Sequence, residues 1–487
     1  MDRRIVHGPS AASAGDSRAR SEAIADHLTL VVGVGLVLFA LVVYVASNPN
    51  RGNFYNHFVW QASAWLDGQA TIPYPVGPDT GLPHSNEYFQ DVLAGDGSNG
   101  IPVGRALLPF PPLPAVVLVP FVAAFGLATD AQLLGAVIGA LDVGLAFWVL
   151  GRLRIGPSVR VLATLFFGFG TVFWYTAMLG TTWYLAHLVA VGLTFGSIAV
   201  ALDGDPRAIA AAAMDGADAV AVPPPPSALS SAPGSRPRGL LDRRQVAAGF
   251  LLGLAATARL TVGLGLPFLF LVGAGTWRRR AASAAVGAAI PLTALGIYNL
   301  VTSGHAFNPA YEAIWATEIR FYPPLYPYLQ YHLDWAIEDP RYVPQNLVLM
   351  LTNLPRILPA CDPGSAGRAL FDPSCPLVIP RDDGMGLLWT SPGWLLALTM
   401  VHSRRGRLVT GALAAVGLIA LANLMHFSQG WVQFGYRFSN DFAPFLLLVV
   451  AIGIERLGGL RWFVLGLVGL SVIVNWWGVV WGVTLGW

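Results

Sequence analysis

Two carboxylates four positions apart, Glu87 and Asp91, stand in the polar stretch SNEYFQDV and are the first residues whose spacing suggests chemistry. On a helix, residues i and i+4 are neighbours on one face. Repulsion between two close carboxylates raises the pKa of one of them toward the range in which it works as a general base. Asp91 is therefore the predicted base and Glu87 its neighbour. The alternative is a solvated acidic loop.

Three arginines, Arg105, Arg259 and Arg437, lie in segments that we expect on the same side of the molecule as these carboxylates. A guanidinium group binds phosphate through paired, charge-assisted hydrogen bonds. The sequence therefore predicts a phosphate-binding group, with Tyr436 beside Arg437 as a further ligand. The alternative for Arg437 is an interface anchor or an ion pair with Asp441.

A short amphipathic helix is predicted ahead of the carboxylates, capped by Asn53 and ending at Asp67-Gly68. Its apolar face recurs at helical spacing through Phe54, Phe58, Ala62 and Trp65. Its polar side, expected to face water or substrate, holds Asn56, His57, Gln61 and Ser63. Of these, His57 is a further candidate base and Asn56 a candidate substrate ligand.

The elements that position these residues are predicted to be membrane helices. Hydrophobic residues make up 55% of the 487 positions and charged ones only 11%, against about 25% charged in an average soluble domain. Residues 28–46 are an uncharged apolar run, about 19 residues, which spans a bilayer of roughly 30 Å. We prefer an uncleaved first helix to a signal peptide, because the run is long and the preceding tail carries mixed charge.

Further apolar segments follow at 131–150, 161–179, 183–202, 246–276, 281–302, 386–401, 408–425, 442–455 and 462–486. Arginine clusters between them are expected inside, which orients the chain in the cytoplasmic membrane with its N-terminus inside. This holds if the proline-rich residues 111–126 lie in the interface without crossing, and if 246–276 forms a hairpin of two short helices with Arg259 at its turn. The expected fold is an all-α polytopic membrane protein of about 11 helices.

Four segments lie outside this core of helices. They are a cytoplasmic tail at 1–27, a first outer loop at 48–126, a disordered cytoplasmic loop at 203–244 and an extracytoplasmic cap at 303–385. Cys361 and Cys375 both fall in the cap, where they either form a disulfide or remain free thiols. The chain has no spacing typical of a metal site, and we expect no metal, cofactor or nucleic-acid partner.

Three stretches resemble the GT-C superfamily of membrane glycosyltransferases, in its protein O-mannosyltransferase and aminoarabinose-transferase branch. PFPPLPAVVLVPFVAAFG is similar to the family's His/Tyr-Pro-Pro-Leu segment. GFLLGLAATARLTVGLGLP resembles its glycine-rich helix hairpin, with Arg259 at the basic position of the turn. GYRFSNDFAPF resembles the entry to a late helix. The organisation of residues 28–460 is also similar.

The resemblance implies transfer of a sugar from a polyprenyl-phosphate donor in the bilayer to a hydroxyl of a glycan, lipid or protein acceptor. An acid in the first outer loop deprotonates the acceptor in that family, yet NPNRGNFYNHF and GTTWY lack the family's acids. The base is therefore Asp91 or Glu87, His57, or absent. The alternative function is a non-catalytic protein that binds, moves or scaffolds lipid-linked saccharides. An ion-coupled transporter using the intrahelical Asp142 is a third.

Overall fold

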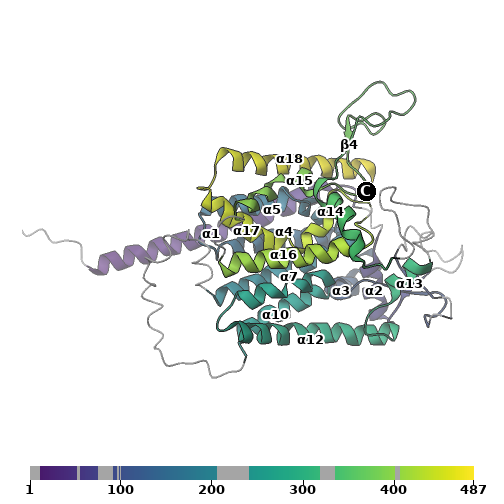
Figure 1. The fold of residues 1–487 in the computed structure, drawn as a ribbon, viewed down its shortest axis with the longest axis horizontal. Coiled ribbons are helices and arrows are strands. Elements are labelled where there is room, and N and C mark those ends of the chain that lie inside the picture. The colour runs from purple at the N-terminus through teal and green to yellow at the C-terminus, as the bar shows by residue number, and fades with distance from the viewer. Residues whose placement is uncertain are drawn as a thin grey trace, which may run out of the picture.

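Long apolar helices packed side by side form the body of the protein (Figure 1). The computed structural model describes residues 11–51, 55–74, 91–95, 98, 100–205, 241–317, 335–400, 406–430 and 432–487, with side chains from residue 27 onward. Within these ranges six helices are long and apolar enough to cross a membrane, and a bent pair makes a seventh. The prediction of a largely helical membrane protein is thereby supported.

The six candidate spans are His27–Ser47 of α1 (Ala11–Ser47), α4 (Ala131–Leu150), α7 (Thr182–Asp203), α12 (Trp277–Ser303), α16 (Arg407–Met425) and α18 (Trp462–Leu485). The bent pair is α5 (Pro157–Phe169) with α6 (Phe173–Leu179), which meet at 55°. The shorter helices are α2 (His57–Leu66), α3 (Leu113–Phe125), α10 (Arg243–Ala256), α11 (Leu266–Leu271), α13 (Ala310–Thr317), α14 (Val343–Thr352), α15 (Leu387–Thr390) and α17 (Ala443–Arg456). Short 3-10 helices include η3 (Leu260–Gly265), η5 (Pro340–Tyr342), η6 (Pro392–Met400) and η7 (Arg437–Asp441).

Side-chain caps fix where several of these helices begin. The Asp130 carboxylate accepts from the backbone N–H of Leu133 at the start of α4. Asp242 accepts from two N–H groups of α10, and the Thr276 hydroxyl accepts from Arg279 at the start of α12. Each cap satisfies backbone donors that the first helical turn leaves unpaired.

The predicted arginine clusters gather at one end of the bundle, which we call the arginine end. Arg152 pairs with Asp203 at 2.8 Å, and Arg407 pairs with Asp205 at 2.8 Å. Glu455 accepts from the backbone N–H of Gly156 at 2.7 Å. Loops between four different pairs of helices therefore meet here, as the arginine pattern predicted.

The hairpin predicted for 246–276 is confirmed. The Gln245 side chain, in the first turn of α10, donates to the carbonyl of Val272 just after α11 at 3.0 Å. Arg279 of α12 lies 4.0 Å from Asp242. Both ends of the hairpin thus lie at the arginine end, and the turn holding Arg259 lies away from it.

The first loop starts and ends at the opposite end, since Arg51 after α1 pairs with Asp130 before α4 at 3.3 Å. The segment containing α3 therefore does not cross the bundle, as predicted. In this loop β1 (Ile72–Pro73) and β2 (Leu93–Ala94) flank β3 (Arg105–Leu107) in an antiparallel sheet. Ile72 pairs with Ala106, and Leu93 pairs with Leu107.

The predicted helix at the start of this loop forms, but its polar side is not exposed. It is α2, whose N-cap is Asn56 and not the predicted Asn53, with Asp67 as its C-cap and Gly68 at a φ of 70°. Asn56, His57 and Gln61 are buried. The prediction of a water-facing polar side is wrong, because the His57 ring packs against Phe110 and Trp183 and its Nδ1 lies 2.8 Å from the Thr182 hydroxyl.

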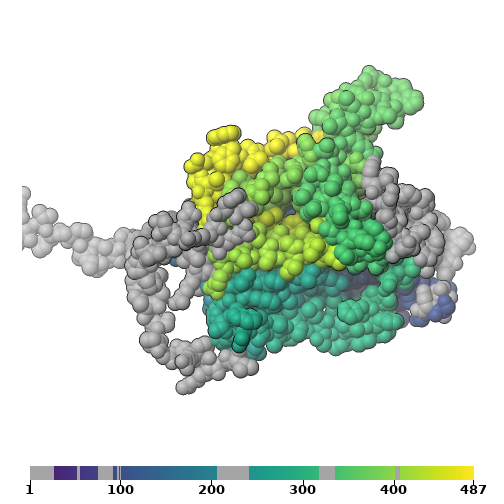
Figure 2. All heavy atoms as spheres, in the orientation of Figure 1, coloured from purple at the N-terminus to yellow at the C-terminus, as the bar shows by residue number. Residues whose placement is uncertain are grey.

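Residues 303–385 include a folded cap at this same end, which we call the cap end. The cap holds α13, α14 and the paired strands β4 (Arg356–Ile357) and β5 (Val378–Ile379), which project beside the C-terminus (Figure 1). In Figure 2 this hairpin is the green lobe above the bundle. A disulfide joins Cys361 to Cys375, so the first of the two predicted alternatives is confirmed and the cysteines are not free thiols.

Removing this disulfide should loosen the β4–β5 hairpin and leave the bundle intact. The two cysteines are 14 positions apart, and a cross-link that closes a loop of this size contributes about 3 kcal/mol to stability. We expect the Cys361→Ser/Cys375→Ser variant to exchange hairpin amides faster, measured by hydrogen exchange, while the thermal transition of the bundle stays in place. Unchanged hairpin protection in the variant would contradict a stabilising role.

Candidate functional site

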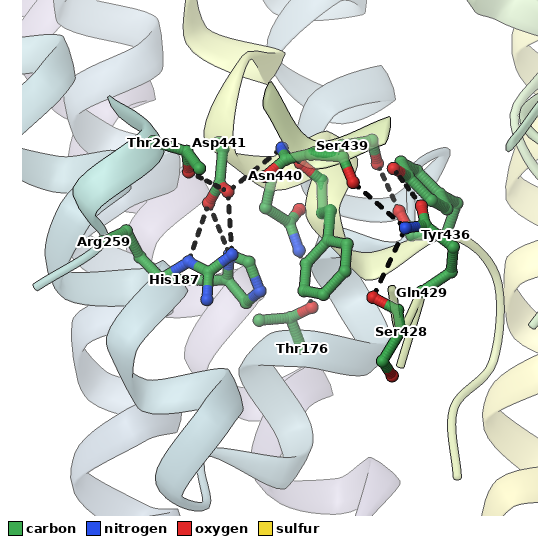
Figure 3. Close-up of polar contacts among 12 residues, drawn as sticks. Thr176, His187, Arg259, Thr261, Ser428, Gln429, Tyr436, Ser439, Asn440 and Asp441 are labelled. Atoms are coloured by element: carbon green, nitrogen blue, oxygen red, sulfur yellow. Dashed lines mark hydrogen bonds and ion pairs between the residues drawn. The ribbon is translucent and has the colours of Figure 1, made fainter. Parts of the chain in front are cut away.

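Asp441, at the end of η7, is the centre of a buried polar cluster at the cap end (Figure 3). Its Oδ1 lies 2.7 Å from Nδ1 of His187 and accepts from Nε of Arg259 at 3.2 Å. Its Oδ2 accepts from Nη2 of Arg259 at 2.9 Å and from the Thr261 hydroxyl at 2.8 Å. The Asn423 side chain donates to the same oxygen at 3.3 Å. One carboxylate therefore holds four side chains from three separate segments.

Three turns of the chain bring these groups together. His187 is in the second turn of α7, near its cap-end start, and Arg259 is the N-cap of η3 at the hairpin turn. Asp441 precedes α17 by two residues. Placing an arginine at the turn keeps its guanidinium out of the middle of the bilayer, where the cost is at least ~2.5 kcal/mol.

The electrostatics favour a charged Asp441. Burial disfavours its carboxylate form, but Arg259 and His187 outweigh that effect and hold the pKa of the carboxyl below its usual range. Because this carboxylate accepts, the neutral imidazole of His187 carries its proton on Nδ1. Its Nε2 is buried and has no hydrogen-bond partner among the described residues.

Arg437 lies beside this cluster with two of its three guanidinium nitrogens unpaired among the described residues. It is 7% exposed, and its Nε and Nη1 atoms have no hydrogen-bond partner in the described ranges. Its guanidinium lies 5.6 Å from the ring centre of Tyr184 and 5.4 Å from that of Phe438. Arg259 lies 5.1 Å from the same Phe438 ring. Two of the three predicted phosphate-binding arginines are thus brought together around Phe438.

An ion pair between Arg437 and Asp441, one of the alternatives that the sequence offers, does not form. The carboxylate of Asp441 is taken up by Arg259, His187, Thr261 and Asn423. Arg437 makes no ion pair within the part of the chain that the structure describes. A buried guanidinium without a carboxylate is costly in an apolar site, so its open N–H groups indicate a place for an anionic ligand.

Two other buried polar atoms near this arginine are also open. The Tyr175 hydroxyl and Oδ1 of Asn440 have no hydrogen-bond partner among the described residues. The Tyr175 ring packs against Tyr184, which itself faces Arg437. The Asn440 side chain donates to the Thr176 hydroxyl at 2.8 Å, which ties η7 to α6 (Figure 3).

The loop before η7 approaches α6 closely at Gly435. Its φ is 70°, and a Cβ there would lie 2.2 Å from the Val172 side chain. Only glycine fits this approach, which brings the neighbouring Tyr436 inward. Tyr436 donates to the Gln429 side chain at 2.8 Å, and burial raises the pKa of its hydroxyl, so it stays protonated. Its role in the structure is to brace the loop.

The other predicted site residues lie elsewhere in the first loop. Arg105 donates from Nε to the Thr71 hydroxyl at 3.2 Å and from Nη2 to the Thr71 carbonyl, which fastens β3 to β1. Asp91 has a φ of 60° and precedes Val92, which packs with Trp60 and Ile72. Neither Arg259 nor Arg437 makes an ion pair or hydrogen bond with Asp91 in the described ranges.

Glu87 lies outside the described residues, as does most of SNEYFQDV, so the predicted carboxylate pair stays a prediction. Asn56 and His57 lie in the buried contact between α2 and the start of α7. Asp142 is buried on α4 against Gly192 of α7, and its Oδ2 has no partner among the described residues. It lies on the α4–α7 contact and apart from the Asp441 cluster.

His187 is the main residue that the sequence-based search did not select. It is a single histidine within an otherwise apolar segment, preceded by the polar turn GTT. An ionisable residue inside a membrane helix is by default a functional candidate. The same reasoning that made Asp142 a candidate therefore applies to His187, which is the histidine that Asp441 contacts.

No protein-family model, curated protein or solved structure matches the chain. The site itself offers a buried arginine with open donors, a second arginine neutralised by a carboxylate, and an imidazole oriented by that carboxylate.

Proposed function

We propose that the protein transfers a sugar from a polyprenyl-phosphate donor to an acceptor hydroxyl, within a GT-C-like fold of about 11 membrane helices. The observation that carries the proposal is the open guanidinium of Arg437 at the end of a bundle of apolar helices. A phosphate that stays attached to a lipid chain meets both requirements, since its charge binds the arginine and its chain lies in the bilayer.

The two arginines take different roles in this proposal. Arg259 is already paired with Asp441 through both carboxylate oxygens, so its role is to hold Asp441 in place. Arg437 has two open N–H groups for phosphate oxygens. In the transfer step, negative charge develops on the leaving phosphate, and a fixed guanidinium stabilises it.

The cap supports placing the reaction on the extracytoplasmic face. Disulfides persist in oxidising compartments, and the Cys361–Cys375 bridge belongs to the cap. The cap is fastened to the loop that leads to η7, since Asn346 donates to the carbonyl of His426 at 2.9 Å and Glu338 lies 2.7 Å from His426 Nδ1. The Asp441 cluster and the disulfide therefore share one end of the bundle.

Reconstituted proteoliposomes test this function. Purified protein is given polyprenyl-phosphate hexose or pentose donors with a panel of hydroxyl acceptors, and released polyprenyl phosphate is measured by mass spectrometry. We expect donor-dependent release of polyprenyl phosphate. Unphosphorylated polyprenol is the control ligand and should not compete.

The absence of an acid from NPNRGNFYNHF and GTTWY favours one second function, a protein that binds lipid-linked saccharides without chemistry. Tight binding of polyprenyl phosphate with no release from any donor would select it. Absence of binding to any polyprenyl phosphate would contradict both functions.

A further inference from the structure

We propose that His187 is the general base of the transfer reaction, accepting the acceptor's proton at Nε2, and that Asp441 is the residue that positions it. The proposal rests on the proposed function and adds the identity of the base. The stretches NPNRGNFYNHF and GTTWY contain no acid, whereas His187 is already held by a carboxylate in the cluster beside Arg437.

Asp441 itself is poorly suited to take a proton. Its two oxygens receive contacts from Arg259, Thr261, Asn423 and His187, and both arginine contacts are charge-assisted. A carboxylate so engaged remains ionised and serves to orient the groups around it. The His187 Nδ1–H···Oδ1 contact of 2.7 Å fixes the ring and directs the lone pair of Nε2 away from Asp441.

Nε2 of His187 is buried and has no hydrogen-bond partner in the described ranges, and the residue is 0% exposed. Buried polar atoms in native proteins are nearly all hydrogen-bonded, and a catalytic role is one of the explanations for an exception. The open Nε2 is therefore the second observation, besides Asp441, that indicates a reacting partner.

Phe438 connects this nitrogen with the phosphate-binding arginine. Its ring centre lies 6.1 Å from that of His187, and the guanidinium carbons of Arg259 and Arg437 lie 5.1 Å and 5.4 Å from it. The Phe438 ring therefore contacts the imidazole of His187 and lies near both guanidinium groups. In the proposed reaction the acceptor hydroxyl lies at Nε2 of His187 and the donor phosphate lies at Arg437, on either side of this ring.

The step is balanced by these groups alone. The acceptor oxygen forms a bond to the anomeric carbon as its proton moves to Nε2 of His187. The bond from the anomeric carbon to the phosphate oxygen breaks, and its electron pair stays on the polyprenyl phosphate, next to Arg437. The imidazolium then returns its proton to water. Asp441 stabilises the imidazolium and stays ionised throughout.

The test replaces His187 by Asn, because the Asn amide can keep a hydrogen bond to Asp441 while removing Nε2. We expect kcat to fall by about 10²- to 10⁴-fold, with the affinity for sugar-free polyprenyl phosphate changed by less than about threefold. His426→Asn is the matched control, because His426 also contacts a carboxylate, Glu338, at 2.7 Å at the same end of the bundle. Its turnover should stay at the wild-type level.

The pH profile of the wild-type protein gives a second readout. Activity should decline on the acid side with a slope of one proton, since a protonated Nε2 cannot accept, and His187→Asn should lack this decline. The charged groups that act on the ring are Asp441 and Arg437 from η7 and Arg259 from the hairpin turn. The nearest tyrosines face these groups: Tyr184 faces Arg437, and Tyr436 faces Asp441 and Arg259.

Each outcome has a separate meaning. Wild-type turnover in His187→Asn, or the absence of an acid limb in the wild type, overturns the assignment of the base while the transfer function stands. Loss of turnover in Asp91→Asn with retention in His187→Asn moves the base to the first loop. Wild-type protein that binds polyprenyl phosphate without turnover overturns the function itself. If His187→Asn does not fold, the turnover of His187→Gln and the acid limb of the wild-type pH profile test the same assignment of the base.

Discussion

Replacing Arg437 by Met should remove polyprenyl-phosphate binding without destabilising the protein. Truncating one partner of a buried, hydrogen-bonded charge pair costs about 2–5 kcal/mol of binding free energy, so the dissociation constant should rise at least about 30-fold. The thermal midpoint of the unliganded protein should stay the same or rise. Met fills a similar volume and removes a buried charge that has no ion-pair partner in the described part of the chain.

The measurement follows tryptophan fluorescence during titration with polyprenyl-phosphate liposomes, next to a thermal melt in detergent. Arg278→Met is the matched control, because Arg278 stacks on Trp277 at the arginine end and should bind like the wild type. A destabilised Arg437→Met variant would show that this guanidinium is structural. Unchanged lipid binding would remove Arg437 from the site.

Replacing Asp441 by Asn should give the opposite pattern, a large loss of stability. The change leaves Arg259 facing a neutral amide in a buried cluster, and breaking a buried pair by removing one partner costs about 3–5 kcal/mol. The free energy of unfolding in mixed micelles should fall by that amount. The fall should be measurable without any ligand.

A double-mutant cycle separates the pair from the rest of the cluster. Adding Arg259→Met to Asp441→Asn removes the uncompensated charge, so the double variant should recover part of the lost stability. Additive losses in the two variants would mean that the 2.9 Å contact contributes little. A stable Asp441→Asn protein would contradict a central role for this carboxylate.

Sequence alone predicted the elements best where a pattern is continuous. The apolar run at 131–150 coincides with α4, and the arginine clusters correctly predicted that 246–276 folds back on itself. A long uncharged run has few alternatives in lipid, because every backbone group must be satisfied within it. Charge clusters constrain topology in a similarly simple way.

The site was less predictable because its contacts join distant segments. Arg259 and Arg437 were selected, but the pairing of Asp441 with Arg259 spans 182 positions and leaves no local signal. The polar side of α2 was assigned to water because the helix looks amphipathic in isolation. The partner that buries it, around Thr182 and Trp183, comes from another segment of the chain.

The hairpin of α10 and α11 has a consequence for how the protein is made. Arg259 is synthesised long before Asp441, because the two residues are 182 positions apart in the chain. Until then an arginine without its carboxylate sits at the turn of two helices of 14 and 6 residues, each too short to cross a bilayer alone. The hairpin can pack against α7 and α12 as soon as α12 has been synthesised, but the ion pair of Arg259 can form only after η7 has been synthesised. Closure of the Asp441 cluster is therefore a late step in the assembly of the membrane domain.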